Sequence, residues 1–405
     1  MSGISRRRSQ CAILATMVLL IGFGALQAQA RPALSLLLPT FKVYQPLLLN
    51  PGGAPRWVSG YYVGYQRDLY PVAAVDFSAI THLIVGRIRP ASDGSVITDF
   101  DIDPVNGPAM ARALADRAHQ NNRKAILMLG GAGEHAGFVA AAQPARRAAF
   151  VQNLLATLDD LGYDGIDVDW EPILDSDRPL LLALLQDLRA ARPGILLTIP
   201  VGWVNANFPG AVDAYYAQLA GLVNQINIMS YDMAGNWDGW ESWHFAALGG
   251  HSPSRPSSIE TSVGSYLSAG VPAVKLGIGI GFYGSCWRGV TQPRQPLNGQ
   301  VSQGESDNAM SYANIMQHYY QPAVRSFDAL AKVPYLSSAA GLGPQSCTFI
   351  SYEDAESIAA KGTYVRSQGL GGTIIWTIGQ GHIATAPVGS RDPLLLAVRQ
   401  AFLDP

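Results

Sequence analysis

From residue 57 onward, short apolar runs rich in β-branched residues alternate with longer segments in which alanine and leucine recur at helical spacing. The short runs predict buried strands, and the longer periodic segments predict helices. The predicted strands cover residues 58–65, 82–88, 124–129, 165–170, 195–201, 225–231, 274–280 and 373–377. Helices are expected between them, for example over residues 107–120, 145–161, 178–191 and 258–269.

The alternation of strands and helices predicts parallel βα units and an α/β fold. Eight units favour a closed (β/α)8 TIM barrel, because most intervals between the strands suit one crossover helix. A doubly wound open sheet is the alternative. No glycine-rich phosphate loop follows the first strand, which argues against a nucleotide-binding version of that sheet. In a barrel, functional side chains gather where the strands end.

Two stretches depart from the repeating pattern. Residues 283–347, between the seventh and eighth strands, are too many for one loop and predict a small inserted subdomain. Residues 31–56 hold five prolines among leucines, which excludes a continuous helix or a central strand and predicts an extended linker. The barrel itself is expected to occupy residues 57–403.

The first 30 residues predict a secretory signal peptide. Three arginines at residues 6–8 precede an apolar run over residues 11–26, and Ala28-Gln29-Ala30 offers a small-residue cleavage site. The apolar run is shorter than the ~20 residues that a membrane span needs, so an uncleaved anchor is the less favoured alternative. We therefore expect a secreted or periplasmic protein without membrane association after cleavage.

Signal cleavage would leave two cysteines, Cys286 and Cys347. In an exported protein such a pair predicts one disulfide rather than a metal or redox site, with two separate thiols as the alternative. The pair lies at the two ends of the predicted insertion. A bridge is therefore expected to attach that insertion to the barrel.

Composition narrows the function classes. The 405 residues are 48% hydrophobic and 14% charged, and loss of the three arginines leaves 25 bases against 30 acids, a net charge of −5. Because no basic patch is present, nucleic acid is not an expected partner. The seven histidines show no pairing at metal-ligand spacing, so we predict no metal and no cofactor, and we expect a monomer.

Residues 164–171, Asp-Gly-Ile-Asp-Val-Asp-Trp-Glu, hold four acids in and directly beside the predicted strand 165–170. In an extended strand Asp167, Asp169 and Glu171 share one face, about 6–7 Å apart, whereas Asp164 points the other way. Three such carboxylates in low dielectric cannot all ionise, so a proton is retained, as a general acid requires. A calcium or magnesium site is the alternative, but the interleaving residues are apolar rather than glycine and polar.

This run resembles the DxxDxDxE signature of family 18 glycoside hydrolases, the chitinases and their relatives. Residues 229–232, Met-Ser-Tyr-Asp, resemble the family's M-x-Y-D segment on the sixth strand. Residues 277–284, ending Phe-Tyr-Gly, resemble its G-x-P-x-Y-G segment, and residues 371–376 resemble its last strand, which ends in tryptophan. The motifs occur in the family's order, and the resemblance extends over residues 57–402.

The resemblance implies a role for each acid. Glu171 would act as the acid and later as the base, and Asp169 would orient the N–H of the substrate's acetamido group. Asp167 would hold a shared proton, and Tyr231 would hydrogen-bond the acetamido oxygen. Substrate contacts are expected from Asp232, Trp376, Met229, Tyr65 and Trp237, and structural roles from Asp164, Gly130 and Gly131.

Two segments depart from the family pattern. The third strand ends Met128-Leu129-Gly130-Gly131 where the family has S-x-G-G, so a hydroxyl is missing, and we expect altered proton affinities in the acid row. The second strand ends Val85-Gly86-Arg87-Ile88 where an aromatic segment is usual. An inward-pointing Arg87 is expected to pair with Asp167 and lower its pKa.

The resemblance implies an exported glycoside hydrolase that cleaves β-1,4 bonds of N-acetylglucosamine polymers, chitin or chito-oligosaccharides, by substrate-assisted retention. One alternative is an endo-N-acetylglucosaminidase that acts on glycans or peptidoglycan with the same acids. Another is a non-catalytic chitin-binding lectin on the same barrel. Such lectins typically lose the acid, and Glu171 is present here.

Overall fold

The computed structural model describes residues 56–208, 210–297, 302–303 and 308–404. The predicted signal peptide and all but the last residue of the predicted linker therefore lie outside the described residues. Everything described belongs to one compact unit of the chain. Within these ranges, no helix has both the length and the apolar character of a membrane span.

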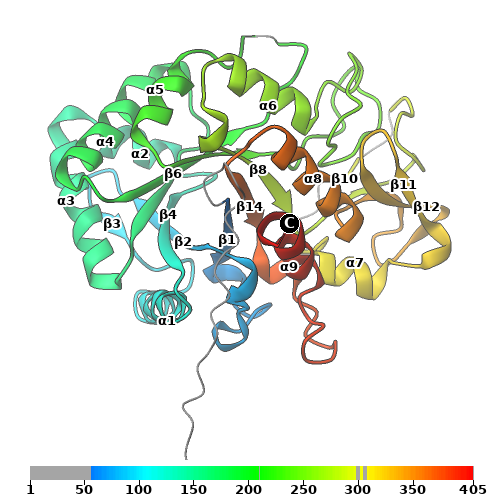
Figure 1. Cartoon of the computed structure of the whole chain (residues 1–405), viewed down its shortest axis with the longest axis horizontal. Coiled ribbons are helices and arrows are strands. Elements are labelled where there is room, and N and C mark those ends of the chain that lie inside the picture. The colour runs from blue at the N-terminus through cyan, green and yellow to red at the C-terminus, as the bar shows by residue number, and fades with distance from the viewer. Residues whose placement is uncertain (1–55, 209, 298–301, 304–307, 405) are drawn as a thin grey trace, which may run out of the picture. The chain divides into compact units, whose positions relative to one another are not determined.

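Eight parallel strands close into a barrel in the order β1-β2-β4-β5-β6-β7-β8-β14 (Figure 1). Closure is complete because β1 pairs in parallel with both β2 and β14. This confirms the TIM barrel and rules out the open sheet. The barrel strands are β1 (Trp57–Val63), β2 (His82–Pro90), β4 (Lys124–Gly130), β5 (Gly165–Asp169), β6 (Leu196–Gly202), β7 (Gln225–Met229), β8 (Leu276–Gly281) and β14 (Gly372–Trp376).

The observed strands begin and end within two residues of the predicted bounds. At the functional end, β1 and β7 stop two residues before the predicted ends, at Val63 and Met229, and β2 continues two residues past its predicted end, to Pro90. Tyr65 instead lies in a short 3-10 helix, Gly64–Gln66, and Asp232 adopts a left-handed conformation with φ 51°. The backbone thus turns away at the barrel mouth earlier than the apolar pattern indicates.

Helices connect the strands around the outside of the barrel (Figure 1). In α3, Pro144 occupies the first turn, where its missing N–H costs nothing, and Gly162 ends the helix with φ 76°. The helices are α1 (Asn106–Gln120), α2 (His135–Ala141), α3 (Pro144–Leu161), α4 (Arg178–Ala191), α5 (Tyr215–Leu222), α6 (Ile259–Ser268), α7 (Tyr312–His318), α8 (Ala355–Ser367) and α9 (Pro393–Val398).

Two apolar layers result from the alternation of side chains along each strand. In β5, Ile166 and Val168 join the larger layer between the strands and the helices. A smaller cluster fills the barrel interior and includes Tyr61, Met128 and Tyr231. The acids of β5 therefore point into the barrel, because they occupy the positions between the outward-facing apolar residues.

The predicted insertion forms a five-stranded antiparallel sheet in the order β10-β9-β13-β12-β11. Its strands are β9 (Ser285–Trp287), β10 (Ser302–Gln303), β11 (Arg325–Asp328), β12 (Val333–Leu342) and β13 (Cys347–Ser351), and a short β3 (Val96–Ile97) pairs with β2 outside the barrel. The sheet extends past the expected end at residue 347 because β13 pairs with β9 up to Ser351.

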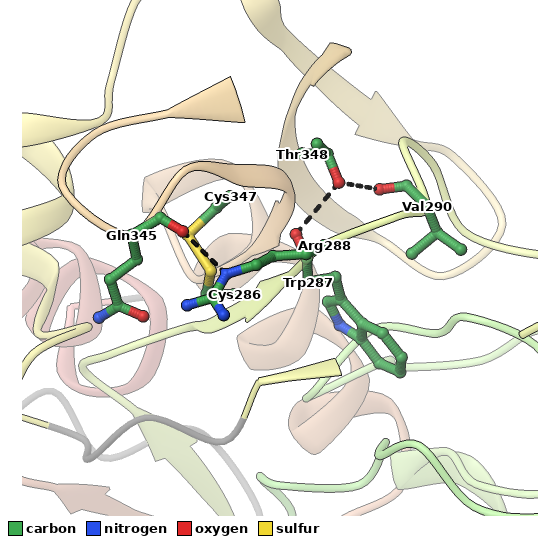
Figure 2. The surroundings of a disulfide bond; sticks show 7 residues. All are labelled: Cys286, Trp287, Arg288, Val290, Gln345, Cys347 and Thr348. Atoms are coloured by element: carbon green, nitrogen blue, oxygen red, sulfur yellow. Dashed lines mark hydrogen bonds between the residues drawn. A yellow bond between two sulfur atoms is a disulfide. The ribbon is translucent and has the colours of Figure 1, made fainter. Parts of the chain in front are cut away.

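Cys286 in β9 and Cys347 in β13 form the predicted disulfide (Figure 2). Both strands belong to the inserted sheet, where they pair antiparallel, so the bridge does not attach the insertion to the barrel as expected. Thr348 Oγ1 strengthens the same junction by donating to the carbonyl oxygens of Trp287 and Val290, at 3.2 and 2.6 Å. The disulfide therefore stabilises the insertion's own sheet.

Reduction of this disulfide is expected to lower the free energy of unfolding by about 2–4 kcal/mol, because the bridge closes a long loop in the unfolded chain. The measurement is a denaturant melt with and without a phosphine reductant. The Cys286→Ser/Cys347→Ser variant serves as the control, since its melt should not respond to the reductant. A wild-type melt unchanged after full reduction contradicts the prediction.

Candidate active site

The acids of β5 lie at the functional end of the barrel. Asp167 and Asp169 are buried on the inward face of the strand, and Glu171 follows the strand end. Trp170 between them points outward and stacks on Phe138 of α2, with ring centroids 4.7 Å apart. This contact fixes Trp170 against α2, so Asp169 and Glu171 on either side of it are held at the functional end of the barrel.

Asp167 accepts two hydroxyl hydrogen bonds inside the barrel. Tyr61 Oη donates to Oδ2 at 2.7 Å, and Thr198 Oγ1 donates to Oδ1 at 2.5 Å. Burial raises the pKa of Asp167 to about 6, an effect that the two hydrogen bonds oppose and the charge of Glu171 adds to. Asp167 is therefore largely ionised at pH 7 and acts as a hydrogen-bond acceptor.

Asp169 and Glu171 are joined by a hydrogen bond between their carboxyl groups. Burial raises the pKa of Asp169 well above its usual range, and the charges of Glu171 and Asp167 raise it further. Burial also raises the pKa of Glu171, while the hydrogen bond from Asp169 opposes that rise. Both shifts favour a protonated carboxyl group in this pair, with Asp169 as the hydrogen-bond donor.

A pocket of about 510 Å³ opens above this pair. Tyr231 and Met229 come from the end of β7, and Trp376 comes from the end of β14, with its ring 5.3 Å from that of Tyr61. Tyr283 Oη donates to Asp232 Oδ2 at 2.7 Å across the rim. The lining residues are Tyr61, Val63, Tyr65, Arg87, Asp101, Met128, Gly131, Ala132, Asp169, Glu171, Met229, Tyr231, Asp232, Tyr283 and Trp376.

The pocket combines a shared carboxyl proton, a tyrosine hydroxyl and an indole ring around one enclosed volume. Such a set can protonate a leaving oxygen beside a bound ring. Among the described residues, no group of three or more histidine, cysteine or acidic side chains is placed to hold a metal ion.

The family assignment follows from comparison with known proteins. The model of Glycosyl hydrolases family 18 matches residues 58–381, most of the chain. The chain belongs to glycosyl hydrolase family 18. It is a chitinase-like glycosidase.

Several relatives and structures support this membership. Chitinase A1 of Niallia circulans is 32% identical over 270 residues, 59% of this chain, and the match spans 38% of that longer protein. Endochitinase 1 of Metarhizium robertsii is 27% identical over 375 residues, 81% of this chain and 85% of that protein. The crystal structure of Ostrinia furnacalis Group IV chitinase in complex with allosamidin superposes with a TM-score of 0.73 at 27% identity, covering 86% of this chain and 99% of that one.

The structure brings most of the sequence-predicted residues of this family 18 protein to one place. Glu171, Asp169, Tyr231, Asp232, Trp376, Met229, Tyr65 and Gly131 line the pocket, and Asp167 lies buried beside it. Trp237 is not among the lining residues. Its ring packs on those of Trp240 and Trp203 at 4.6 and 6.0 Å, in the loops that follow β6 and β7. The predicted substrate contact of Trp237 therefore has no support from the pocket.

Asp164 lies on the opposite side of β5 from the acid row. Its carboxylate accepts from Lys124 Nζ at 2.8 Å and from the backbone N–H of Ala125 at 2.9 Å, and it also pairs with His119. These contacts join the starts of β4 and β5. The side chain thus points away from the pocket, as the strand alternation predicts.

Gly130 and Gly131 allow the end of β4 to approach the acids closely. Both have positive φ, 96° and 97°. A Cβ on Gly130 would lie 2.2 Å from the Phe138 ring and 2.6 Å from the carbonyl oxygen of Asp169. Gly131 donates its N–H to that same oxygen at 2.7 Å, so the pair of glycines positions Asp169 through its backbone.

The expectation for Arg87 is wrong. Its guanidinium pairs with Asp101 at 3.0 Å and with Glu134 at 3.4 Å, not with Asp167. Asp101 lies between β3 and α1, and Glu134 lies between β4 and α2. The strand pattern of the sequence does not predict where these two acids lie. Arg87 therefore ties two loops together at the pocket rim, and the pKa of Asp167 is raised rather than lowered.

The shared proton expected on Asp167 stays a prediction, and the contacts around the three acids bear on it. The resemblance implies a shared proton on Asp167, whereas the hydrogen-bonded carboxyl pair is Asp169 and Glu171. Sequence reasoning missed the hydroxyls of Tyr61 and Thr198 that make this possible. Thr198 is a polar residue in the otherwise apolar strand β6, which is a signal that sequence analysis could use, whereas Tyr61 shares β1 with Ser59 and Tyr62 and is not distinguished in this way.

Proposed function

We propose that this chain is an exported chitinase that cleaves β-1,4 bonds of N-acetylglucosamine polymers by substrate-assisted retention. The observation that carries the proposal is the placement of Asp169 and Glu171 together in the 510 Å³ pocket, beside Tyr231 and Trp376. A carboxyl group that keeps its proton near neutral pH can deliver it to a glycosidic oxygen.

In the first step the proton passes from Asp169 to Glu171, and Glu171 transfers it to the glycosidic oxygen. The carbonyl oxygen of the 2-acetamido group attacks C1 of the same sugar while the bond from C1 to the leaving oxygen breaks. A cyclic oxazolinium ion forms, and its positive charge faces the carboxylate that Asp169 now carries. The proton, the leaving group and the charge are thus all accounted for.

In the second step Glu171 acts as the base. It accepts a proton from a water molecule, whose oxygen attacks C1 and reopens the oxazolinium ring. Two inversions at C1 leave the product with the β configuration of the substrate. Tyr231 would donate its hydroxyl to the acetamido oxygen, Asp232 would contact the sugar, and Trp376 would form the apolar surface beneath the ring.

Substrate and location are proposed on separate grounds. The matched relatives include an endochitinase and Chitinase B of Serratia marcescens, and the matched Ostrinia structure holds allosamidin. Export is supported by the signal-like residues 1–30 and by the disulfide, which persists in oxidising compartments.

The test is incubation of the chain from Arg31 onward with a chito-oligosaccharide, with products followed by mass and their anomers by NMR. Shorter oligosaccharides with the β-anomer in excess at early times support the proposal. An early excess of the α-anomer refutes substrate-assisted retention. Intact oligosaccharide refutes chitin as the substrate and directs attention to peptidoglycan or glycoprotein glycans, and to sugar binding without hydrolysis if those also remain intact.

A further inference from the structure

The surroundings of Asp167 are set by strand register on both sides. In the barrel its partner on β4 is Met128, and its partner on β6 is Thr198. Residues in register on neighbouring strands point to the same face of the sheet, so all three side chains enter the barrel interior at one level. Position 128 and position 198 thus flank the same carboxylate.

Only one of these two flanking positions supplies a hydrogen bond. Thr198 is almost fully buried, and its Oγ1 donates to Asp167 Oδ1 at 2.5 Å. Met128 is equally buried but belongs to the apolar interior cluster. The second hydroxyl on Asp167 comes from Tyr61 of β1, so the β4 side offers Asp167 a thioether and no donor.

We propose that Thr198 is a positioning residue, whose hydroxyl holds the ionised carboxylate of Asp167 from β6 and replaces a hydroxyl that β4 lacks at Met128. The inference rests on the proposed function, since it concerns how the same acids are kept ready for the reaction. Thr198 does not line the pocket, so it acts through Asp167 and never touches the substrate.

Thr198 influences Asp169 and Glu171 through the charge of Asp167. A hydroxyl that donates to a carboxylate favours the ionised form, and Thr198 lowers the pKa of Asp167 in this way. Ionised Asp167 in turn raises the pKa of Asp169, which then keeps the proton that it shares with Glu171. The hydroxyl of Thr198 therefore influences the protonation of Glu171 through the carboxyl groups of Asp167 and Asp169.

The geometry also argues against ordinary packing. A valine has the shape of threonine and fills the same interior volume, and the β-strand favours either residue. Threonine in a buried site is costly unless its hydroxyl is bonded, and here its bond is to a carboxylate rather than to the backbone. The specific contact, not the volume, is what distinguishes Thr198.

The first test compares Thr198→Val with Thr198→Ser across the pH profile of kcat/KM. Loss of a hydrogen bond to a charged group is expected to move the acidic limb to higher pH by about one unit in Thr198→Val, which lowers kcat/KM about 10-fold on that limb. Thr198→Ser retains the hydroxyl and should follow the wild type. A Thr198→Val profile that superimposes on the wild type overturns the proposal, as does a serine variant that behaves like valine.

The second test removes the hydroxyl at position 198 on β6 and introduces one at position 128 on β4. In the Thr198→Val/Met128→Ser variant a donor returns on β4, in register with Asp167, and the acidic limb is expected to shift back toward the wild-type pH. A double variant that keeps the full alkaline shift overturns the claim that the two flanks are equivalent.

A third measurement does not depend on substrate. The raised pKa of Asp167 contributes stability below about pH 4, which is lost as pH rises through about 6. Thr198→Val raises this pKa further, so its Tm should match the wild type near pH 4 and fall progressively below it between pH 6 and 8. Parallel Tm curves overturn the inference, whereas wild-type protein without hydrolytic activity refutes the proposed function instead.

Discussion

Glu171→Gln is expected to lower kcat on chito-oligosaccharides by about 10³-fold, within the range that general acid–base groups contribute. Glutamine keeps the size of the side chain but cannot deliver a proton to the leaving oxygen or accept one from water. The pocket lining is otherwise unchanged, so the Kd for the oligosaccharide should stay near that of the wild type. Product formation measures the first effect, and calorimetric titration measures the second.

Glu260→Gln is the matched control for this variant. Glu260 is exposed in the first turn of α6 and does not line the pocket, so the same chemical change there should leave kcat within a few-fold of the wild type. Unimpaired hydrolysis by Glu171→Gln contradicts the assignment of the acid. Loss of both binding and activity indicates a misfolded variant rather than a missing proton.

Asp169→Asn is expected to lower kcat by about 10²-fold, the effect of removing one group that stabilises developing charge. Asparagine cannot carry the shared proton, and it offers no negative charge to the oxazolinium ion. Because the effect arises in the reaction step, kcat should fall much more than KM changes. Steady-state kinetics at several pH values provide the measurement.

Asp164→Asn provides the matched control on the same strand segment. Its carboxylate faces outward and pairs with Lys124, so the substitution removes a structural contact without reaching the pocket. It is expected to lower Tm slightly and to leave kcat near the wild-type value. Equal losses of kcat in the two variants mean that the segment responds to any change of charge, which contradicts a specific role for Asp169.

The sequence predicted the barrel well because the patterns that identify strands and helices lie within short segments of the chain. The alternation of short apolar runs with helical segments identified all eight barrel strands within two residues. The same alternation placed Asp167 and Asp169 inside the barrel and Asp164 outside, since successive side chains in a strand face opposite ways. No tertiary contact is needed for either inference.

Two expectations failed where a partner from elsewhere in the chain decides the outcome, and the substrate contact of Trp237 stays a prediction. Arg87 reaches Asp101 and Glu134 because two loops fold over the pocket rim. The disulfide links strands of the insertion because β9 and β13 pair with each other. Trp237 packs on neighbouring tryptophans because the loops after β6 and β7 lie together.

The sequence by itself therefore determined the strand order and the inward acid row, and it predicts a general acid there, because these inferences follow from spacing within one strand or between successive elements. Only the tertiary structure decided which groups surround each acid, with Asp169 and Glu171 lining the pocket and Asp167 buried against two hydroxyl groups. Asp167 is held by Tyr61 and Thr198, which lie 106 and 31 residues away in the chain. Closure of the barrel brings these residues together in its interior, where burial raises the pKa of Asp167 and the two hydroxyl hydrogen bonds oppose that rise.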